Sequence, residues 1–160
     1  MYIGIMKQKY YIDTSVFGGY FDEEFEIITK LLFDAILKEN VRILYSELTE
    51  NELETAPQKV KDFIIGLPKA FIEFIEITPE AIDLADKYIA EKVVGKTSRD
   101  DCIHIALATV NRADVLISWN CKHIVNYKRI RGYNSVNLKF GYPMLEIRSP
   151  QEMISYENEK

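Results

Sequence analysis

The chain has 160 residues, of which 48% are apolar and 28% charged, and its formal net charge at pH 7 is −5. A chain of this length buries roughly two-thirds of its unfolded surface in one domain, and we expect residues 1–160 to form a single domain. No apolar run approaches the roughly 20 residues needed to cross a bilayer, and the N-terminal stretch lacks the pattern of a secretion signal. We therefore expect a cytoplasmic protein that does not bind a membrane. The negative net charge argues against nucleic-acid binding that is driven by a positive charge over the whole surface.

Several classes of protein are excluded by residues that they need and this chain lacks. Two cysteines, Cys102 and Cys121, make neither a disulfide framework nor a zinc pattern, and we expect both to be buried thiols. The glycine-rich motifs of dinucleotide and P-loop sites are missing. A dehalogenase-like phosphatase would need an acid where Ser15 stands, and a receiver domain would need acids in place of Tyr11 and Ile12.

Strand-like and helix-like segments alternate along the chain. In chain order we predict a strand at 10–13, a helix at 24–39, a strand at 42–45, a helix capped by Ser46, a helix from Pro57 to Gly66, and a strand at 71–77. There follow a helix begun by Thr78-Pro79, a buried helix at 98–111, a strand at 115–119, a strand at 145–149, and a terminal helix opened by a capping box at 149–152. This order predicts an α/β three-layer sandwich with a mostly parallel central sheet of about five strands.

Polar side chains stand where the predicted strands end, which is where ligands bind in such folds. Asp13 ends the first strand, Glu52 lies in the helix after the second, Asp101 opens the buried helix, and Asn120 follows the fourth strand. Each residue also has a structural interpretation: an Asx-turn for Asp13, a solvated acid for Glu52, a helix N-terminus for Asp101 and a turn for Asn120. Clustered carboxylates need a cation among them, and Mg²⁺ or Mn²⁺ suits carboxylate oxygens. The acids together therefore predict a metal site, at which bound water would attack a phosphodiester.

Four segments, YYIDTSVF, SELTENEL, DDCIHIALA and ADVLISWN, together resemble the motifs of PIN domains, including VapC-like toxin ribonucleases. The resemblance spans Tyr10 to about Ile154, and it implies a PIN-like fold and a divalent-metal-dependent endoribonuclease. It matches Asp13, Glu52 and Asp101 to the family's catalytic, metal-binding acids, and Thr14 or Ser15 to the small hydroxyl residue beside the first acid. It also implies an RNA substrate, a small antitoxin protein as partner in a type II toxin–antitoxin pair, and a homodimer.

One position departs from the family, because Asn120 stands where an acid is usual. An amide oxygen still coordinates a metal but brings no charge, so Asn120 remains a further candidate ligand and the number of metals stays open. The alternative function is a catalytically weak or inactive PIN-like scaffold that binds RNA or protein.

Two other features have open interpretations. The stretch 122–139 carries five basic residues and no acid, which fits either a local nucleic-acid patch, with Lys122 as a substrate-binding residue beside Thr14 and Ser15, or a solvated loop. His104 lies one helical turn after Asp101 and is expected to be a satisfied core histidine rather than a catalytic residue.

Overall fold

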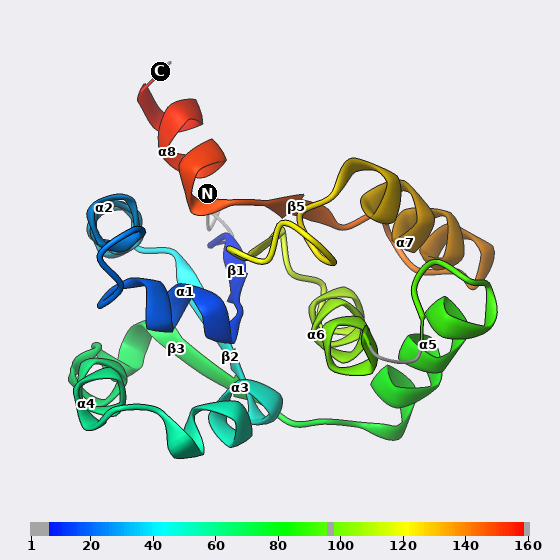
Figure 1. The fold of residues 1–160 in the computed structure, drawn as a ribbon, viewed down its shortest axis with the longest axis horizontal. Coiled ribbons are helices and arrows are strands. Elements are labelled where there is room, and N and C mark those ends of the chain that lie inside the picture. The colour runs from blue at the N-terminus through cyan, green and yellow to red at the C-terminus, as the bar shows by residue number, and fades with distance from the viewer. Residues whose placement is uncertain (1–6, 96–97, 159–160) are drawn as a thin grey trace, which may run out of the picture.

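The structure is a computed structural model that describes residues 7–95 and 98–158. At its centre lies one sheet of five parallel strands in the order β3-β2-β1-β4-β5 (Figure 1). The strands are β1 (Lys9–Ile12), β2 (Arg42–Ser46), β3 (Ile72–Ile75), β4 (Val115–Ile117) and β5 (Glu146–Arg148). Helices cover both faces of the sheet, so the predicted three-layer α/β sandwich is confirmed, and every strand pair is parallel.

The helices divide between the two faces of the sheet, as Figure 1 shows. On one face lie α1 (Thr14–Gly19), α2 (Glu26–Glu39), α4 (Gln58–Gly66) and α8 (Pro150–Asn158). On the other lie α5 (Pro79–Ala90), α6 (Arg99–Val110) and α7 (Tyr127–Lys139). The short α3 (Glu47–Glu52) and the 3₁₀ turns η1 (Leu53–Thr55) and η2 (Lys69–Phe71) complete the connections.

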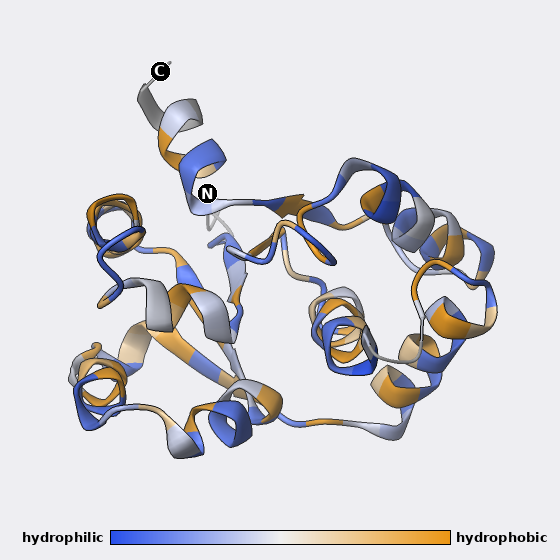
Figure 2. Cartoon of the chain, viewed as in Figure 1, coloured by the Kyte–Doolittle hydropathy of each residue, from blue (hydrophilic) through white to orange (hydrophobic). Residues whose placement is uncertain are grey.

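Each face of the sheet has its own hydrophobic core, because successive side chains of a strand point to opposite faces. In β1, Tyr10 and Ile12 pack with α1 and α2, whereas Tyr11 packs with α5 and α6. Helix α6 is buried along residues 102–109, as its continuous apolar run predicted. Figure 2 shows that the helices around the sheet carry both hydrophilic and hydrophobic residues.

The predicted helix starts are confirmed by their capping bonds. The side chain of Ser46 accepts from the backbone N of Thr49, and Thr78 caps α5 in the same way. At α8 the capping box is complete, because Ser149 Oγ accepts from the N of Glu152 while Glu152 Oε1 accepts from the N of Ser149. These bonds satisfy amides that a helix N-terminus otherwise leaves unpaired.

Two local expectations need correction, and one short helix was not predicted. The stretch 122–139 is not a loop, because Tyr127–Lys139 forms the helix α7, whose buried face includes Asn134 and Asn137 beside Tyr133 and Val136. A short helix, α1, directly follows Asp13. Cys102 is buried as expected, but Cys121 is exposed.

The strand order places a topological switch point between β1 and β4, because the chain first adds strands on one side of β1 and then on the other. The carboxyl ends of strands at a switch point form the usual ligand crevice of a parallel α/β sheet.

Among the residues described, no helix is both long and apolar enough to span a membrane. Residues 1–6, part of the segment in which we find no secretion signal, lie outside the described ranges.

Candidate functional site

Asp13 lies at the switch point, where β1 and β4 end side by side. Its backbone N donates to the carbonyl of Ile117 at 3.2 Å, which extends the pairing of the two strands by one step. The side chain is only 3% exposed. Ser15 Oγ donates to Oδ1 and Ser118 Oγ donates to Oδ2, both at 2.6 Å. The two hydroxyls therefore fix the orientation of this buried carboxylate.

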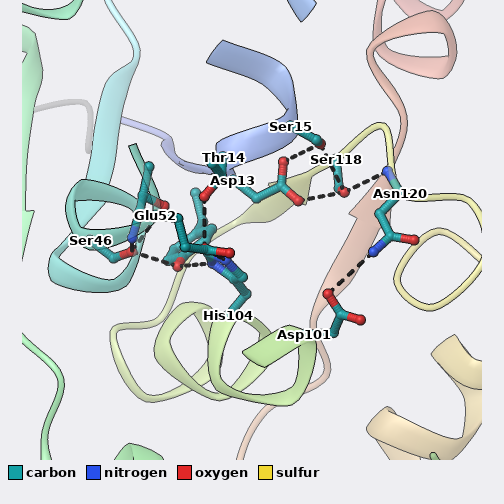
Figure 3. Close-up of polar contacts among 11 residues, drawn as sticks. Asp13, Thr14, Ser15, Ser46, Glu52, Asp101, His104, Ser118 and Asn120 are labelled. Carbon is teal, nitrogen blue, oxygen red and sulfur yellow. Dashed lines mark hydrogen bonds and ion pairs between the residues drawn. The ribbon is translucent and has the colours of Figure 1, made fainter. Parts of the chain in front are cut away.

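The backbone after β4 in turn holds both hydroxyls. The N of Trp119 donates to Ser15 Oγ, and the N of Asn120 donates to Ser118 Oγ, each at 2.9 Å. Because each serine oxygen accepts a backbone N–H, its own proton is directed to Asp13. The start of α1 and the end of β4 are thus joined through one carboxylate (Figure 3).

Glu52, the last residue of α3, lies near Asp13 at the same end of the sheet, after the carboxyl end of β2. Its Oε1 accepts from Thr14 Oγ1 at 2.8 Å and lies 2.5 Å from His104 Nε2. An ionised carboxylate only accepts, so Nε2 carries a proton. The other ring nitrogen, Nδ1, lies 2.6 Å from the hydroxyl of Tyr11, which is also bonded to Ser46. His104 is therefore a satisfied core histidine, as expected, and it also contacts a candidate site residue.

Asp101 lies in the first turn of α6 and faces Asn120, three residues after the end of β4. Asn120 Nδ2 donates to Asp101 Oδ1 at 3.2 Å, while Asn120 Oδ1 accepts from the N of His123 at 3.1 Å. Ser98 makes no side-chain capping bond to this helix. Figure 3 shows the Asp101 carboxylate pointing toward Asn120, apart from the Glu52–His104 pair.

The three acids respond differently to their surroundings. Burial raises the pKa of Asp13 above its ordinary value, although His104, Ser118 and Ser15 oppose the shift. Burial also raises the pKa of Asp101, where His123 and His104 oppose the shift and the charges of Asp13 and Glu52 add to it. For Glu52, burial would raise the pKa, but the bonds and charge from His104 and the Thr14 bond together lower it. Burial therefore makes the charged forms of Asp13 and Asp101 less favourable than those of free carboxyl groups, and a cation bound beside them would offset this cost.

The chemistry of these donors fits a hard divalent cation. A carboxylate offers about four acceptor positions, and only two on Asp13 are taken by the serine hydroxyls. Within residues 7–95 and 98–158, no three histidine, cysteine or acidic side chains are grouped so as to hold a metal by themselves. Mg²⁺ commonly takes one or two protein carboxylates and keeps waters at its other positions, so a cation bound here would have Asp13 and Asp101 as its protein ligands.

The sequence-predicted residues are thus brought to one edge of the sheet, with one exception. Lys122 is exposed on the loop after β4 and makes no ion pair with any residue of the described chain. Three residues of this hydrogen-bond network were not identified from the sequence. They are Ser118, Tyr11, and His104 in its contact with Glu52. The one available signal for Ser118 is that it is a polar residue inside an apolar strand segment, VLISW.

No protein-family model and no curated protein matches the chain. Solved structures do: a VapBC2 structure from Rickettsia felis bound to a promoter DNA fragment has 15% sequence identity and a TM-score of 0.58. A DNA-bound VapBC structure from Salmonella typhimurium has 17% identity and a TM-score of 0.54. Each match covers 89% of this chain and 98% of the other. The chain therefore has the fold found in these VapBC structures, the PIN-like, VapC-like fold that its four sequence motifs predicted.

Proposed function

We propose that this chain is a divalent-metal-dependent endoribonuclease that hydrolyses RNA phosphodiester bonds, and that it is the toxin of a type II toxin–antitoxin pair. The observation that carries the proposal is the meeting of Asp13, Glu52 and Asp101 at the switch point of a parallel sheet, where burial raises the pKa of Asp13 and of Asp101. Such a site suits a cation and an anionic substrate. The VapBC-like fold supports the same function.

In this proposal each residue of the site has a distinct task. Asp13 and Asp101 hold Mg²⁺ or Mn²⁺, Glu52 completes the acidic site, and Asn120 orients Asp101 through its amide. When bound, the cation lowers the pKa of a water and offsets charge on the phosphate. Ser15 fixes Asp13, and Thr14 fixes Glu52. Thr14 and Ser15, which lie beside Asp13 in the chain, and the exposed Lys122 are the proposed substrate-binding residues.

The proposal is tested by incubating the purified chain with single-stranded RNA and Mn²⁺ or Mg²⁺. We expect endonucleolytic cutting that stops in excess EDTA and returns when Mn²⁺ is restored, because Asp13 and Asp101 need a cation to act on a phosphodiester. Cutting that persists in excess EDTA would contradict the proposal, since it would come from a metal-independent activity or from a contaminating nuclease.

The partner and the assembly are also part of the proposal. The similar structures contain VapBC, and by analogy we propose a small antitoxin as partner of this chain, in a homodimeric complex. A groove of about 380 Å³ between η1 and α4 is a candidate contact surface for such a partner, since its lining combines apolar Tyr45, Leu53, Ile64 and Ile65 with charged Glu50, Glu54 and Lys61. Co-expression with the product of a neighbouring short reading frame should yield a stable complex in which RNA cleavage is inhibited.

A second function, a scaffold with little catalysis, is favoured by one observation. Asn120 brings no charge, and its oxygen accepts from the backbone of His123 rather than facing Asp101. The RNA-cleavage experiment separates the two functions, because a scaffold would bind RNA or protein without cutting RNA under any metal condition.

Asn120→Asp tests how far the missing acid limits the site. The new carboxylate would face Asp101, so we expect it to repel that acid without metal and to attract a cation when metal is present. Mn²⁺ binding, measured by isothermal titration calorimetry, should become about tenfold tighter, which corresponds to roughly 1.4 kcal/mol. In EDTA the variant should unfold at a lower temperature than the wild type. Unchanged Mn²⁺ affinity would show that position 120 lies outside the metal's surroundings.

A further inference from the structure

The first turn of α7 exposes an aromatic ring beside a cation. Tyr127 is 73% exposed, whereas Tyr10, Tyr11, Tyr88 and Tyr133 are buried. The guanidinium carbon of Arg131 lies 5.7 Å from the centre of the Tyr127 ring, and its Nη1 donates to the tyrosine hydroxyl at 3.4 Å. Residues four apart on a helix lie on the same side, so the arginine supports one edge of the ring and leaves most of the ring open to solvent.

The surrounding charge is positive, unlike that of the whole chain. Of the five basic residues in 122–139, Lys139 pairs with Glu91, and Arg129 donates to the carbonyl of Val93. The remaining three, Lys122, Lys128 and Arg131, are exposed, and none forms an ion pair with a residue that the structure describes. In a protein of net charge −5 this is a local surface suited to an anion.

This surface begins next to the candidate site. The carbonyl of Asn120 accepts from the N of Ile124 at 3.1 Å and from the N of Val125 at 2.9 Å, so the loop after β4 folds back on itself. Tyr127 follows two residues later, and each residue adds at most about 3.8 Å, so its backbone lies within roughly 12 Å of that carbonyl. Figure 1 shows α7 starting beside this loop and running outward toward the end of α5.

We propose that Tyr127, Arg131, Lys128 and Lys122 form a binding surface for single-stranded RNA, on which an unpaired base stacks against Tyr127 and the cations contact phosphates. An open aromatic ring among cations is the arrangement that proteins use for single strands, since a paired base does not offer its face. The inference rests on the proposed function for the nature of the substrate, and it adds that the RNA strand passes over the first turn of α7.

The test measures binding of a fluorescein-labelled decauridylate to the full chain by anisotropy, in EDTA so that no RNA is cut. Tyr127→Ala should weaken binding about tenfold, whereas Tyr127→Phe should bind like the wild type, because stacking needs the ring and not the hydroxyl. Arg131→Gln should also weaken binding and should reduce the slope of log affinity against log salt by about 1. In a strand that carries 2-aminopurine, the wild type should quench the fluorescence and Tyr127→Ala should not.

Two control variants match these changes elsewhere on the chain. Phe140→Ala removes an aromatic ring that contacts Lys87 and Lys139 just beyond the far end of α7, and Lys38→Gln removes an exposed charge on α2 at the other face of the sheet. Both should bind RNA like the wild type. Circular dichroism would show that the Tyr127 variants fold, as expected for an exposed side chain.

The outcomes separate this inference from the proposed function. Wild-type RNA affinity and quenching in Tyr127→Ala, or equal affinity for duplex RNA, would overturn the inference while leaving metal-dependent cleavage untouched. A Tyr127→Ala variant that keeps its RNA affinity but loses self-association or antitoxin binding would also overturn it, because the surface would then bind protein. Tyr127-dependent RNA binding by a chain that cuts no RNA in Mn²⁺ would support the surface and contradict the nuclease.

Discussion

Asp13→Asn is expected to reduce the rate of RNA cleavage in Mn²⁺ by about 10³-fold or more, since the loss of a metal-binding charge removes several kcal/mol of transition-state stabilisation. The asparagine has nearly the same shape, so the hydroxyls of Ser15 and Ser118 retain a polar partner. The rate is measured under single-turnover conditions with a labelled single-stranded RNA. Asp100→Asn is the matched control, because it removes the same charge from the exposed neighbour of Asp101 and should change the rate by less than about twofold.

Asp13→Asn should also change the free energy of unfolding. A cooperative urea-unfolding transition would show that the variant folds. Burial raises the pKa of Asp13, so between its ordinary value of 3.8 and the raised value the folded state binds more protons than the unfolded state. The contribution of Asp13 to the free energy of unfolding is therefore largest at low pH and falls as pH rises through that interval. Asparagine does not titrate, so the stability of the wild type relative to Asp13→Asn should decrease from about pH 4 to pH 7 in urea unfolding in EDTA. If the difference in stability between the wild type and Asp13→Asn did not depend on pH, the buried environment of Asp13 would be contradicted. Full RNA cleavage by the variant would contradict the proposed role of Asp13 in metal binding.

His104→Ala is expected to lower the free energy of unfolding by about 3 kcal/mol, the second-largest effect that we expect. The ring is 3% exposed and both of its nitrogens are bonded, so its removal leaves a cavity and takes a partner from Tyr11 and from Glu52. RNA cleavage should also fall, because Glu52 loses the contact that positions it. Both effects are measurable, the first by urea denaturation at pH 7 and the second by the cleavage assay in Mn²⁺.

Two comparisons isolate the His104–Glu52 contact. His123→Ala is the matched control, since that ring is only partly buried and its Nδ1 has no hydrogen-bond partner within the described residues, and it should cost less than about 1 kcal/mol. A double-mutant cycle with Glu52→Gln should give a coupling energy of about 1 kcal/mol, reduced by the partial exposure of Glu52. Strict additivity of the two substitutions would mean that the contact contributes nothing to stability.

Much of the fold could be predicted from the sequence because its signals are local. Hydrophobic runs located all five strands, although the structure shortens the last three; the segment 115–119, for example, is a strand only over Val115–Ile117. There the N of Trp119 bonds to Ser15 instead of continuing the ladder. Helix α7 was missed because it buries asparagines, among them Asn134, whose side chain bonds to the backbone of Leu145. The buried face of α7 combines apolar Tyr133 and Val136 with these hydrogen-bonded asparagines, so fewer apolar residues mark the helix in the sequence.

For the candidate site, the sequence by itself determined which residues stand at the strand ends: Asp13, Glu52, Asp101 and Asn120. Only the tertiary structure decided their partners. Asp13 and Ser118 meet because β1 and β4 pair in one register, across a separation of 105 residues, and that register depends on packing of the whole sheet. His104 meets Glu52 because α3 and α6 reach the same sheet edge from different crossovers. Acids are placed by local sequence, but whether each one is tied to a hydroxyl, an amide or an imidazole depends on contacts between distant segments.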